Sequence, residues 1–247
     1  MDYSIQLYSC RDAIKEDMNA TLKKIAEIGY TMVEPAGFFG HAAEEVKSML
    51  DEYGLKVSGT HTGWTLLSDD NFAETVRFHK VIGTSNIILP SIPYWEGKER
   101  LAELIDFINK VQPRLEDEGM RLAYHNHSGE FVPTDYGALV HKELEEKTNI
   151  DFEIDTFWAF NAGVDPISLL ERLKDRVHFI HIKDGFVKKG ETPAKGMPLG
   201  LGEAPVAAVY AKAKELGMQM VVESETQQPD GITEAKICFD FLKSQEK

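Results

Sequence analysis

The segment EGMRLAYHNH, residues 118–127, contains the structural unit that decides the fold. Gly119 follows a helical stretch, and a strand-length apolar run, Arg121–His127, comes directly after it. Glycine accepts the left-handed backbone conformation that ends a helix, so Gly119 predicts a short connection from a helix into a strand. The histidines of the run, His125 and His127, lie at its C-terminal end.

The same unit recurs along the whole chain. Further strand-length runs are Ser4–Ser9, Thr31–Gly37, Lys56–Gly63, Asn86–Ile92, Asp151–Trp158, Val177–Asp184 and Met220–Thr226. A segment with helical spacing follows each run, and helical stretches also end at Gly29, Gly54, Gly83 and Gly217. Capping residues predict helix starts at Ser68–Asp70 and at Asp165. Eight strands, each followed by a helix, predict an α/β fold of the (β/α)₈ TIM barrel type. The alternative is an open doubly wound sheet, but Ser9–Asp12 is not the glycine-rich loop that usually follows its first strand.

Length and charge restrict the function classes. The 247 residues suffice for a single barrel domain spanning residues 1–247, and we see no linker or domain boundary. The formal net charge of −14 disfavours nucleic acid and membranes as partners. Cys10 and Cys238 lie far apart, which predicts a reducing compartment. Because no signal peptide is visible either, we expect a cytoplasmic protein.

Ionisable side chains occupy the C-terminal halves of six predicted strands, where a barrel interior is normally aliphatic. They are Glu34, His61, His125, His127, Glu153, Asp155, His181, Lys183, Glu223 and Glu225. Four of these strands carry two such residues at a spacing of two, for example His125 and His127. That spacing puts both side chains on one face of the strand, and we expect that face to point inward. Burying so many ionisable groups is costly unless they pair closely or share a cation.

We therefore predict one divalent metal ion at the C-terminal mouth, held by His125, Asp155, His181 and Glu223. Two imidazoles with two carboxylates suit Mn²⁺, Co²⁺, Zn²⁺ or Fe²⁺ better than Ca²⁺, and Mg²⁺ stays open.

Other residues have simpler assignments. We expect Glu34, His61, Trp158 and Lys183 to contact substrate, with Trp158 stacking on a sugar ring. Glu153 is interpreted as an ion-pair partner deep in the barrel. His79 and His141, on predicted helices, are expected to face solvent. The long irregular segment Gly185–Ala204 is predicted to form a wall or lid over the site.

Five runs in this order resemble the sugar phosphate isomerase/epimerase group of xylose isomerase-like barrels. They are YHNHSGEF at residues 124–131, DTFW at 155–158, HFIHIKD at 178–184, PLGLGE at 198–203 and VVE at 221–223. The resemblance covers essentially the whole chain. It implies a single-metal barrel acting on sugars, inososes or keto-glycosides, and commonly a homo-oligomer.

Carried over by this resemblance, the metal ligands are Asp155, His181 and Glu223. Many of the epimerases have a glutamate at the strand-five position, where this sequence has His125, and His127 or Glu130 are alternative ligands there. The subgroup with a similar Tyr-His-Asn-His run resembles inosose dehydratases and enzymes that cleave 3-keto-glycosides by elimination.

The predicted function is a metal-dependent sugar isomerase or epimerase. Such an enzyme removes a proton next to a carbonyl through a metal-stabilised enediolate. His127 is the predicted base, shared with Glu223 or Glu225, because a metal-bound His125 has its lone pair engaged. The first alternative is a lyase or dehydratase that works by elimination. A phosphodiester-cleaving nuclease is disfavoured by the acidic charge. A non-catalytic sugar-binding barrel would have no need of a retained metal.

Overall fold

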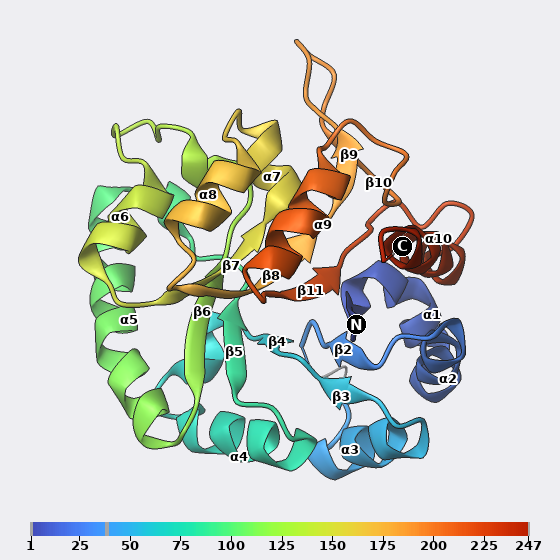
Figure 1. The fold of residues 1–247 in the computed structure, drawn as a ribbon. Helices are drawn as coiled ribbons and strands as arrows, with labels where there is room; N and C mark the ends of the chain where they lie inside the picture. The colour runs from blue at the N-terminus through green and yellow to red at the C-terminus, as the bar shows by residue number, and fades with distance from the viewer. Residues whose placement is uncertain (1, 38–39, 247) are drawn as a thin grey trace.

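The predicted strands pair in parallel around one barrel (Figure 1). The computed structural model describes residues 2–37 and 40–246. The main sheet of this part has nine strands in the order β3-β2-β1-β11-β8-β7-β6-β5-β4. Their bounds are β1 Ser4–Gln6, β2 Met32–Glu34, β3 Lys56–Val57, β4 Thr60–His61, β5 Asn86–Leu89, β6 Arg121–His125, β7 Asp151–Asp155, β8 Val177–Ile182 and β11 Gln219–Val222.

The two ends of this order, β3 and β4, are halves of one predicted strand, Lys56–Gly63, interrupted at Ser58 and Gly59. A Cβ atom at Gly59 would collide with the side chain of Ile88, so a glycine lets the chain pass there. A parallel bridge between Ala36 and His61 joins the second predicted strand to β4. The barrel is therefore nearly closed, and the prediction of a parallel (β/α)₈ barrel is confirmed.

Helices surround the sheet (Figure 1). Their bounds are α1 Arg11–Glu16, α2 Met18–Ile28, α3 Ala43–Glu52, α4 Phe72–Ile82, α5 Lys98–Asp117, α6 Val140–Lys147, α7 Thr156–Asn161, α8 Pro166–Arg172, α9 Val206–Glu215 and α10 Gly231–Ser244. Short 3₁₀ helices are η1 Leu7–Cys10, η2 Trp64–Leu67, η3 Tyr94–Glu96 and η4 Gly129–Phe131. None of the helices in the described residues is long and apolar enough to cross a membrane.

Helix ends follow the sequence signals with one exception. The five predicted glycine stops all have positive φ, for example 83° at Gly83 and 74° at Gly119. Asp165 caps α8, because its carboxylate accepts the N–H groups of Ile167 and Ser168. The start predicted at Ser68–Asp70 is wrong: Ser68 is the C-cap of η2, and α4 begins at Phe72.

Two histidines predicted to face solvent are buried instead. His79 lies on the inner face of α4, where its ring nitrogens are 2.6 Å from Thr75 O and 2.5 Å from Thr60 Oγ1. The ring of His141 stacks between those of Phe131 and Phe152, at 4.5 and 4.6 Å between ring centres. Each histidine faces the strands from its helix. The Nδ1 of His141 lies 2.7 Å from Glu145 Oε1 on the same helix, and its buried Nε2 has no hydrogen-bond partner.

The segment Gly185–Ala204, predicted to be irregular, contains a β-hairpin. Its strands β9, Asp184–Phe186, and β10, Lys195–Met197, pair antiparallel, and the hairpin tip projects from the barrel (Figure 1). The buried Asp184 carboxylate holds the base of the hairpin by hydrogen bonds. It accepts the N–H groups of Gly185 at 2.8 Å, Gly200 and Gly202 at 2.9 Å, and Ala204 at 3.1 Å.

Candidate metal centre

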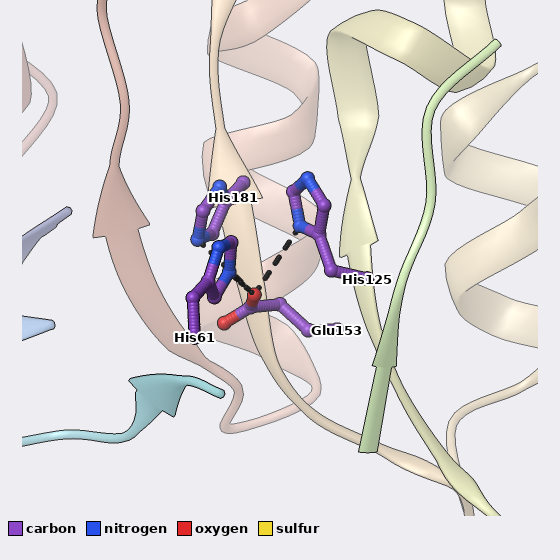
Figure 2. A group of neighbouring side chains, drawn as sticks. All are labelled: His61, His125, Glu153 and His181. Atoms are coloured by element: carbon purple, nitrogen blue, oxygen red, sulfur yellow. Dashed lines mark hydrogen bonds and ion pairs between the residues drawn. The ribbon is translucent and has the colours of Figure 1, made fainter. Parts of the chain in front are cut away.

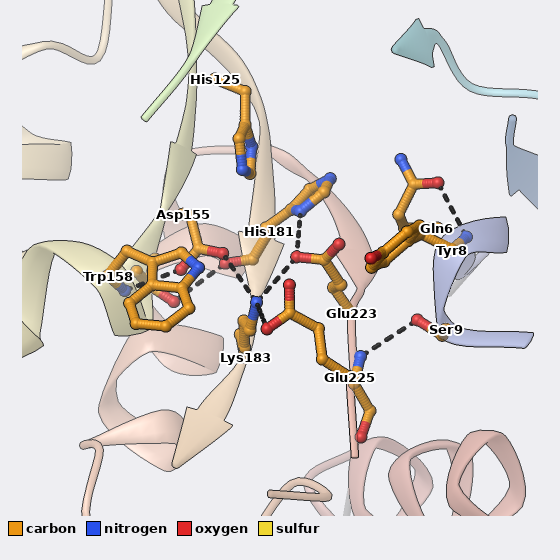
Figure 3. A network of polar contacts seen from close by, with 12 residues as sticks. Gln6, Tyr8, Ser9, His125, Asp155, Trp158, His181, Lys183, Glu223 and Glu225 are labelled. Atoms are coloured by element: carbon orange, nitrogen blue, oxygen red, sulfur yellow. Dashed lines mark hydrogen bonds and ion pairs between the residues drawn. The ribbon is translucent and has the colours of Figure 1, made fainter. Parts of the chain in front are cut away.

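Four side chains from neighbouring strands converge at the C-terminal mouth of the barrel (Figure 3). They are His125 at the end of β6, Asp155 at the end of β7, His181 on β8 and Glu223 directly after β11. All four are buried, and one ligand atom from each lies within 4.8 Å of the others. The structure thus brings together the four residues predicted to hold a metal, which we call the rim set.

The hydrogen bonding of the Asp155 carboxylate indicates whether a cation fits the rim set. Its Oδ1 accepts the N–H of Trp158 at 2.8 Å, which caps α7, but its buried Oδ2 has no hydrogen-bond partner. A buried carboxylate oxygen without a partner is costly, and a divalent cation would satisfy it. Burial, only partly offset by the charge of Lys183, raises the pKa of Asp155 to about 6. The donor set therefore fits a divalent ion.

His181 is held from both sides. Its Nδ1 lies 3.3 Å from Glu223 Oε2, and its Nε2 lies 2.8 Å from Glu34 Oε1. Burial alone lowers the pKa of His181, but the charges of Glu153 and Glu223 and its hydrogen bonds raise it well above the ordinary value. Burial alone raises the pKa of Glu223, but Lys183 and His181 together hold that pKa well below the ordinary value.

Glu34 does not face the mouth. It was expected to contact substrate, but it is 1% exposed, and its Oε1 accepts hydrogen bonds from Gln6 at 2.8 Å and from His181. The register pairs Gln6 with Glu34 on the neighbouring strands β1 and β2, which brings the amide to the carboxylate. Glu34 therefore supports His181 from inside the barrel, and its expected contact with substrate stays a prediction.

Glu153 lies beneath the rim set, and three imidazoles surround its Oε2 (Figure 2). The distances are 2.9 Å from His61 Nε2, 3.2 Å from His125 Nδ1 and 3.2 Å from His181 Nε2. These four residues, which we call the deep set, also have ligand atoms close enough to hold an ion. Burial and the negative charge of Glu34 raise the pKa of Glu153 well above the ordinary value, whereas burial lowers the pKa of His61 to about 4. His61, expected to contact substrate, thus points toward this interior cluster.

Lys183 is completely buried and brings a positive charge among the carboxylates of the site. Its Nζ lies 2.9 Å from Glu225 Oε2, 3.0 Å from Glu223 Oε2 and 3.7 Å from Asp155 Oδ2. Burial alone lowers the pKa of Lys183, but these three carboxylates raise it above the ordinary value. Lys183 also lies 4.8 Å from the centre of the Trp158 ring, so the lysine covers one face of that ring (Figure 3).

The structure distinguishes the three candidates for the metal ligand from the fifth predicted strand, which is β6. His125 belongs to both sets, whereas neither His127 nor Glu130 belongs to a candidate metal group among the described residues. Glu130 is buried and accepts the O–H of Tyr124 at 2.8 Å and the N–H of His127 at 2.9 Å. The half-buried His127 ring lies 5.0 Å from that of His125 and 6.2 Å from that of Trp158, between ring centres.

Sequence reasoning missed the contribution of η1 and α1 to the mouth. Tyr8 is exposed there, the Arg11 guanidinium lies 4.4 Å over its ring, and Arg11 donates to Glu225 O at 3.0 Å. The hairpin also reaches this point: a Cβ atom at Gly196 would lie 3.8 Å from Glu225 Cβ. Of the missed residues only Gln6 had a signal, since it is a polar side chain within the predicted strand Ser4–Ser9.

Comparisons with known proteins agree with this architecture. A family model described as the xylose isomerase-like TIM barrel matches residues 22–245. Two similar sequences are proteins named inosose dehydratase. One, from Geobacillus kaustophilus, is 25% identical over 187 residues, which cover 66% of this chain and 60% of that protein. The other, from Mesomycoplasma hyopneumoniae, is 24% identical over 261 residues, which cover 90% of this chain and 87% of that protein. This chain thus spans less than two thirds of the length of the Geobacillus relative.

Solved structures share the fold. A sugar phosphate isomerase/epimerase from Parabacteroides distasonis has a TM-score of 0.79 at 21% identity, covering 97% of this chain and 96% of that one. A probable 3-DHS dehydratase from Bacillus anthracis has a TM-score of 0.74 at 13% identity, covering 98% and 99%. At these identities the likeness concerns the fold alone.

Proposed function

This chain belongs to the xylose isomerase-like TIM barrel family, and we propose that it is a divalent-metal-dependent dehydratase of an inosose-type substrate, a cyclic polyol with one ketone. The names of the two similar sequences support a dehydratase. One observation of the site carries the choice: among its described carboxylates, only Glu225 has substantial exposed surface, at 29% of the side chain. Its counterpart across the mouth is an imidazole, His127.

The rim set would hold the metal through His125, Asp155, His181 and Glu223. Lewis-acid polarisation of the substrate carbonyl is the chemistry that a divalent ion supplies at such a site. Donor chemistry favours Mn²⁺, Co²⁺, Zn²⁺ or Fe²⁺. Because Glu34, Glu153, Asp155 and Glu223 are all buried, they are poorly placed to exchange protons with a substrate above them.

Glu225 is the proposed base. Lys183 holds its carboxylate at 2.9 Å, which fixes its direction, and the side chain keeps 29% of its surface exposed, so a substrate can reach it. Glu225 takes the proton from the carbon next to the carbonyl. The electron pair of that C–H bond forms a double bond to the carbonyl carbon, and the carbonyl oxygen takes the negative charge. When the carbonyl re-forms, the double bond shifts to the next carbon along, the C–O bond of that carbon breaks with its electron pair leaving on oxygen, and the hydroxyl takes a proton from His127 and departs as water. One carboxylate and one imidazole suffice for this elimination.

The second candidate is a sugar isomerase or epimerase. Glu225 follows β11 and His127 follows β6, with β8 and β7 between those strands in the sheet. The two groups can therefore approach a substrate from different sides, as epimerisation at one carbon requires. Against this, the pair of reachable carboxylates that many epimerases use would need a second exposed carboxylate here.

Deuterium exchange separates the candidates. The metal-loaded protein is incubated with an inosose in D₂O, and both deuterium at the α-carbon and loss of water are measured by mass spectrometry. A dehydratase loses water, an isomerase or epimerase incorporates deuterium without losing water, and a sugar-binding barrel does neither.

Two variants assign the roles. Glu225→Gln should slow both exchange and water loss by about 10²–10⁴-fold, the usual effect of removing a general base. His127→Gln should slow water loss while exchange continues and metal stays bound. If exchange stops in His127→Gln and continues in Glu225→Gln, then His127 is the base and the proposed roles are reversed.

A further inference from the structure

The rim set and the deep set share two histidines, His125 and His181. A neutral imidazole offers one lone pair, because its other ring nitrogen carries a hydrogen. Each shared histidine can therefore give only one nitrogen to a metal. The groups around the other nitrogen decide which set binds an ion.

His181 has its deep nitrogen engaged. Nε2 lies 2.8 Å from Glu34 Oε1 and 3.2 Å from Glu153 Oε2, and both are acceptor atoms. Gln6 Nε2 donates to the same Glu34 oxygen at 2.8 Å, which keeps that carboxylate in place. With the hydrogen on Nε2, the lone pair of His181 is on Nδ1, and Nδ1 faces Glu223 of the rim set at 3.3 Å.

The Glu153 carboxylate also orients His125. Its Nδ1 lies 3.2 Å from Glu153 Oε2, and its other ring nitrogen lies on the far side of the ring (Figure 2). Both His125 Nδ1 and Glu153 Oε1 are buried and lack a hydrogen-bond partner of good geometry. A small rotation of either group would complete a hydrogen bond between His125 and Glu153, and the lone pair of His125 would then be on Nε2.

We propose that Glu153 is a positioning residue that, together with Glu34, holds the two histidine ligands in the tautomers that serve the rim set. It does so without touching the ion: its Oε2 accepts hydrogen from His125 Nδ1 and lies 3.2 Å from His181 Nε2, which donates its hydrogen to Glu34 Oε1. His61, 2.9 Å from the same oxygen, holds Glu153 from the third side. This inference rests on the proposed metal site. It gives a reason for burying a carboxylate where a barrel normally has an aliphatic side chain, since such partners orient metal ligands and strengthen binding.

The wild-type protein tests the tautomers directly. Loaded with Zn²⁺, which is diamagnetic, and labelled with ¹⁵N in histidine, it gives ring-nitrogen shifts that distinguish metal-bound from hydrogen-bearing nitrogens. We expect Zn²⁺ on His125 Nε2 and His181 Nδ1, with hydrogen on the other two nitrogens. The reverse pattern would put the ion in the deep set and overturn the inference.

Zn²⁺ affinity, measured by competition with a chelator, tests the contribution of Glu153. Glu153→Gln should weaken binding by about 10–100-fold. The matched control is Glu145→Gln, because Glu145 also pairs with an imidazole, 2.7 Å from His141 Nδ1, but lies on α6 outside the barrel. It should bind Zn²⁺ like the wild type.

The failures are distinguishable. If Glu153→Gln binds Zn²⁺ as tightly as Glu145→Gln, the role of Glu153 is wrong while the metal site stands. If the wild type binds no Zn²⁺, the metal site itself is wrong and this inference falls with it. If the wild type shows the expected tautomers but no elimination, the inference stands and only the proposed reaction fails. Should Glu153→Gln not fold, the wild-type shifts alone decide.

Discussion

Replacing Lys183 with Met tests how the site tolerates its buried carboxylates. Met has a similar length but no charge. In the metal-free protein the substitution removes the cation that lies 2.9 Å from Glu225, 3.0 Å from Glu223 and 3.7 Å from Asp155. Glu223 and Asp155 would then lose their lysine, and the His181 imidazole, 3.3 Å from Glu223, would be the cation left beside Glu223.

The magnitude follows from burial. Removing one partner of a buried ion pair costs about 3–5 kcal/mol, because the other charge stays uncompensated. Glu225, 29% exposed, can regain water, so Glu223 dominates the loss, and we expect about 3–5 kcal/mol in total. With an unfolding entropy of about 2.1 cal/mol/K for each of the 247 residues, this loss lowers Tm by about 6–10 °C.

Thermal unfolding of the protein with and without metal measures this effect. The loss should be smaller in the metal-loaded protein, because the ion compensates the same carboxylates. The control is Lys236→Met, which removes a surface ion pair with Asp240 and should change stability by less than about 1 kcal/mol. The reasoning is refuted if Lys183→Met matches the control in the metal-free protein, or if metal makes no difference to its loss.

Three further predictions concern the metal and the hairpin. Asp155→Ala and His181→Ala should each lose the roughly one metal ion per chain that we expect in the wild type; full occupancy in both by elemental analysis would contradict the rim set. Metal affinity should fall as the pH decreases through about 6, because burial raises the pKa of Asp155 to about 6 and a proton then competes with the ion. Chelator competition at about pH 5 and about pH 8 measures this change, and equal affinities would contradict it. Shortening the hairpin tip, residues 188–194, should raise KM or abolish turnover with little change in Tm, because Asp184 anchors the base of the hairpin and not its tip. Normal kinetics with a large loss of Tm would show that the tip is structural.

The fold could be predicted because its signals are local. Gly119 ends a helix by its own backbone preference, and the apolar run after it is strand-like without reference to the rest of the chain. The interruption of one strand at Gly59 was not predictable, because it depends on how closely Ile88 of β5 approaches. The predictions that His79 and His141 face solvent were wrong for a similar reason. The sequence showed their helices, but it did not show which residues each helix packs against.

The rim set could be located because every parallel strand brings its C-terminal end to the same mouth. The depth of a side chain below that mouth is a different property, and it depends on pairing between strands. Glu34 has the same residue type and strand position as a mouth residue, yet Gln6 and His181 engage it inside the barrel. Residues far apart in sequence make these contacts, so no local pattern predicts them.

The pairing of Asp155 with His181 shows how much one register shift decides. Phe152 pairs with Val177, but Glu153 pairs with Phe179, so His178 is skipped and Asp155 lies beside His181. Without that bulge Asp155 would pair with Ile180, whose side chain points to the opposite face, and the inward carboxylate would have no imidazole beside it. His178 is exposed, and its Nε2 lies 3.5 Å from Asp151 Oδ2 at the other end of β7, so nothing in its own chemistry marks a bulge. Bulges occur next to active sites because they re-aim side chains. Here one unpaired residue on β8 brings a carboxylate and an imidazole from two strands into one candidate metal site.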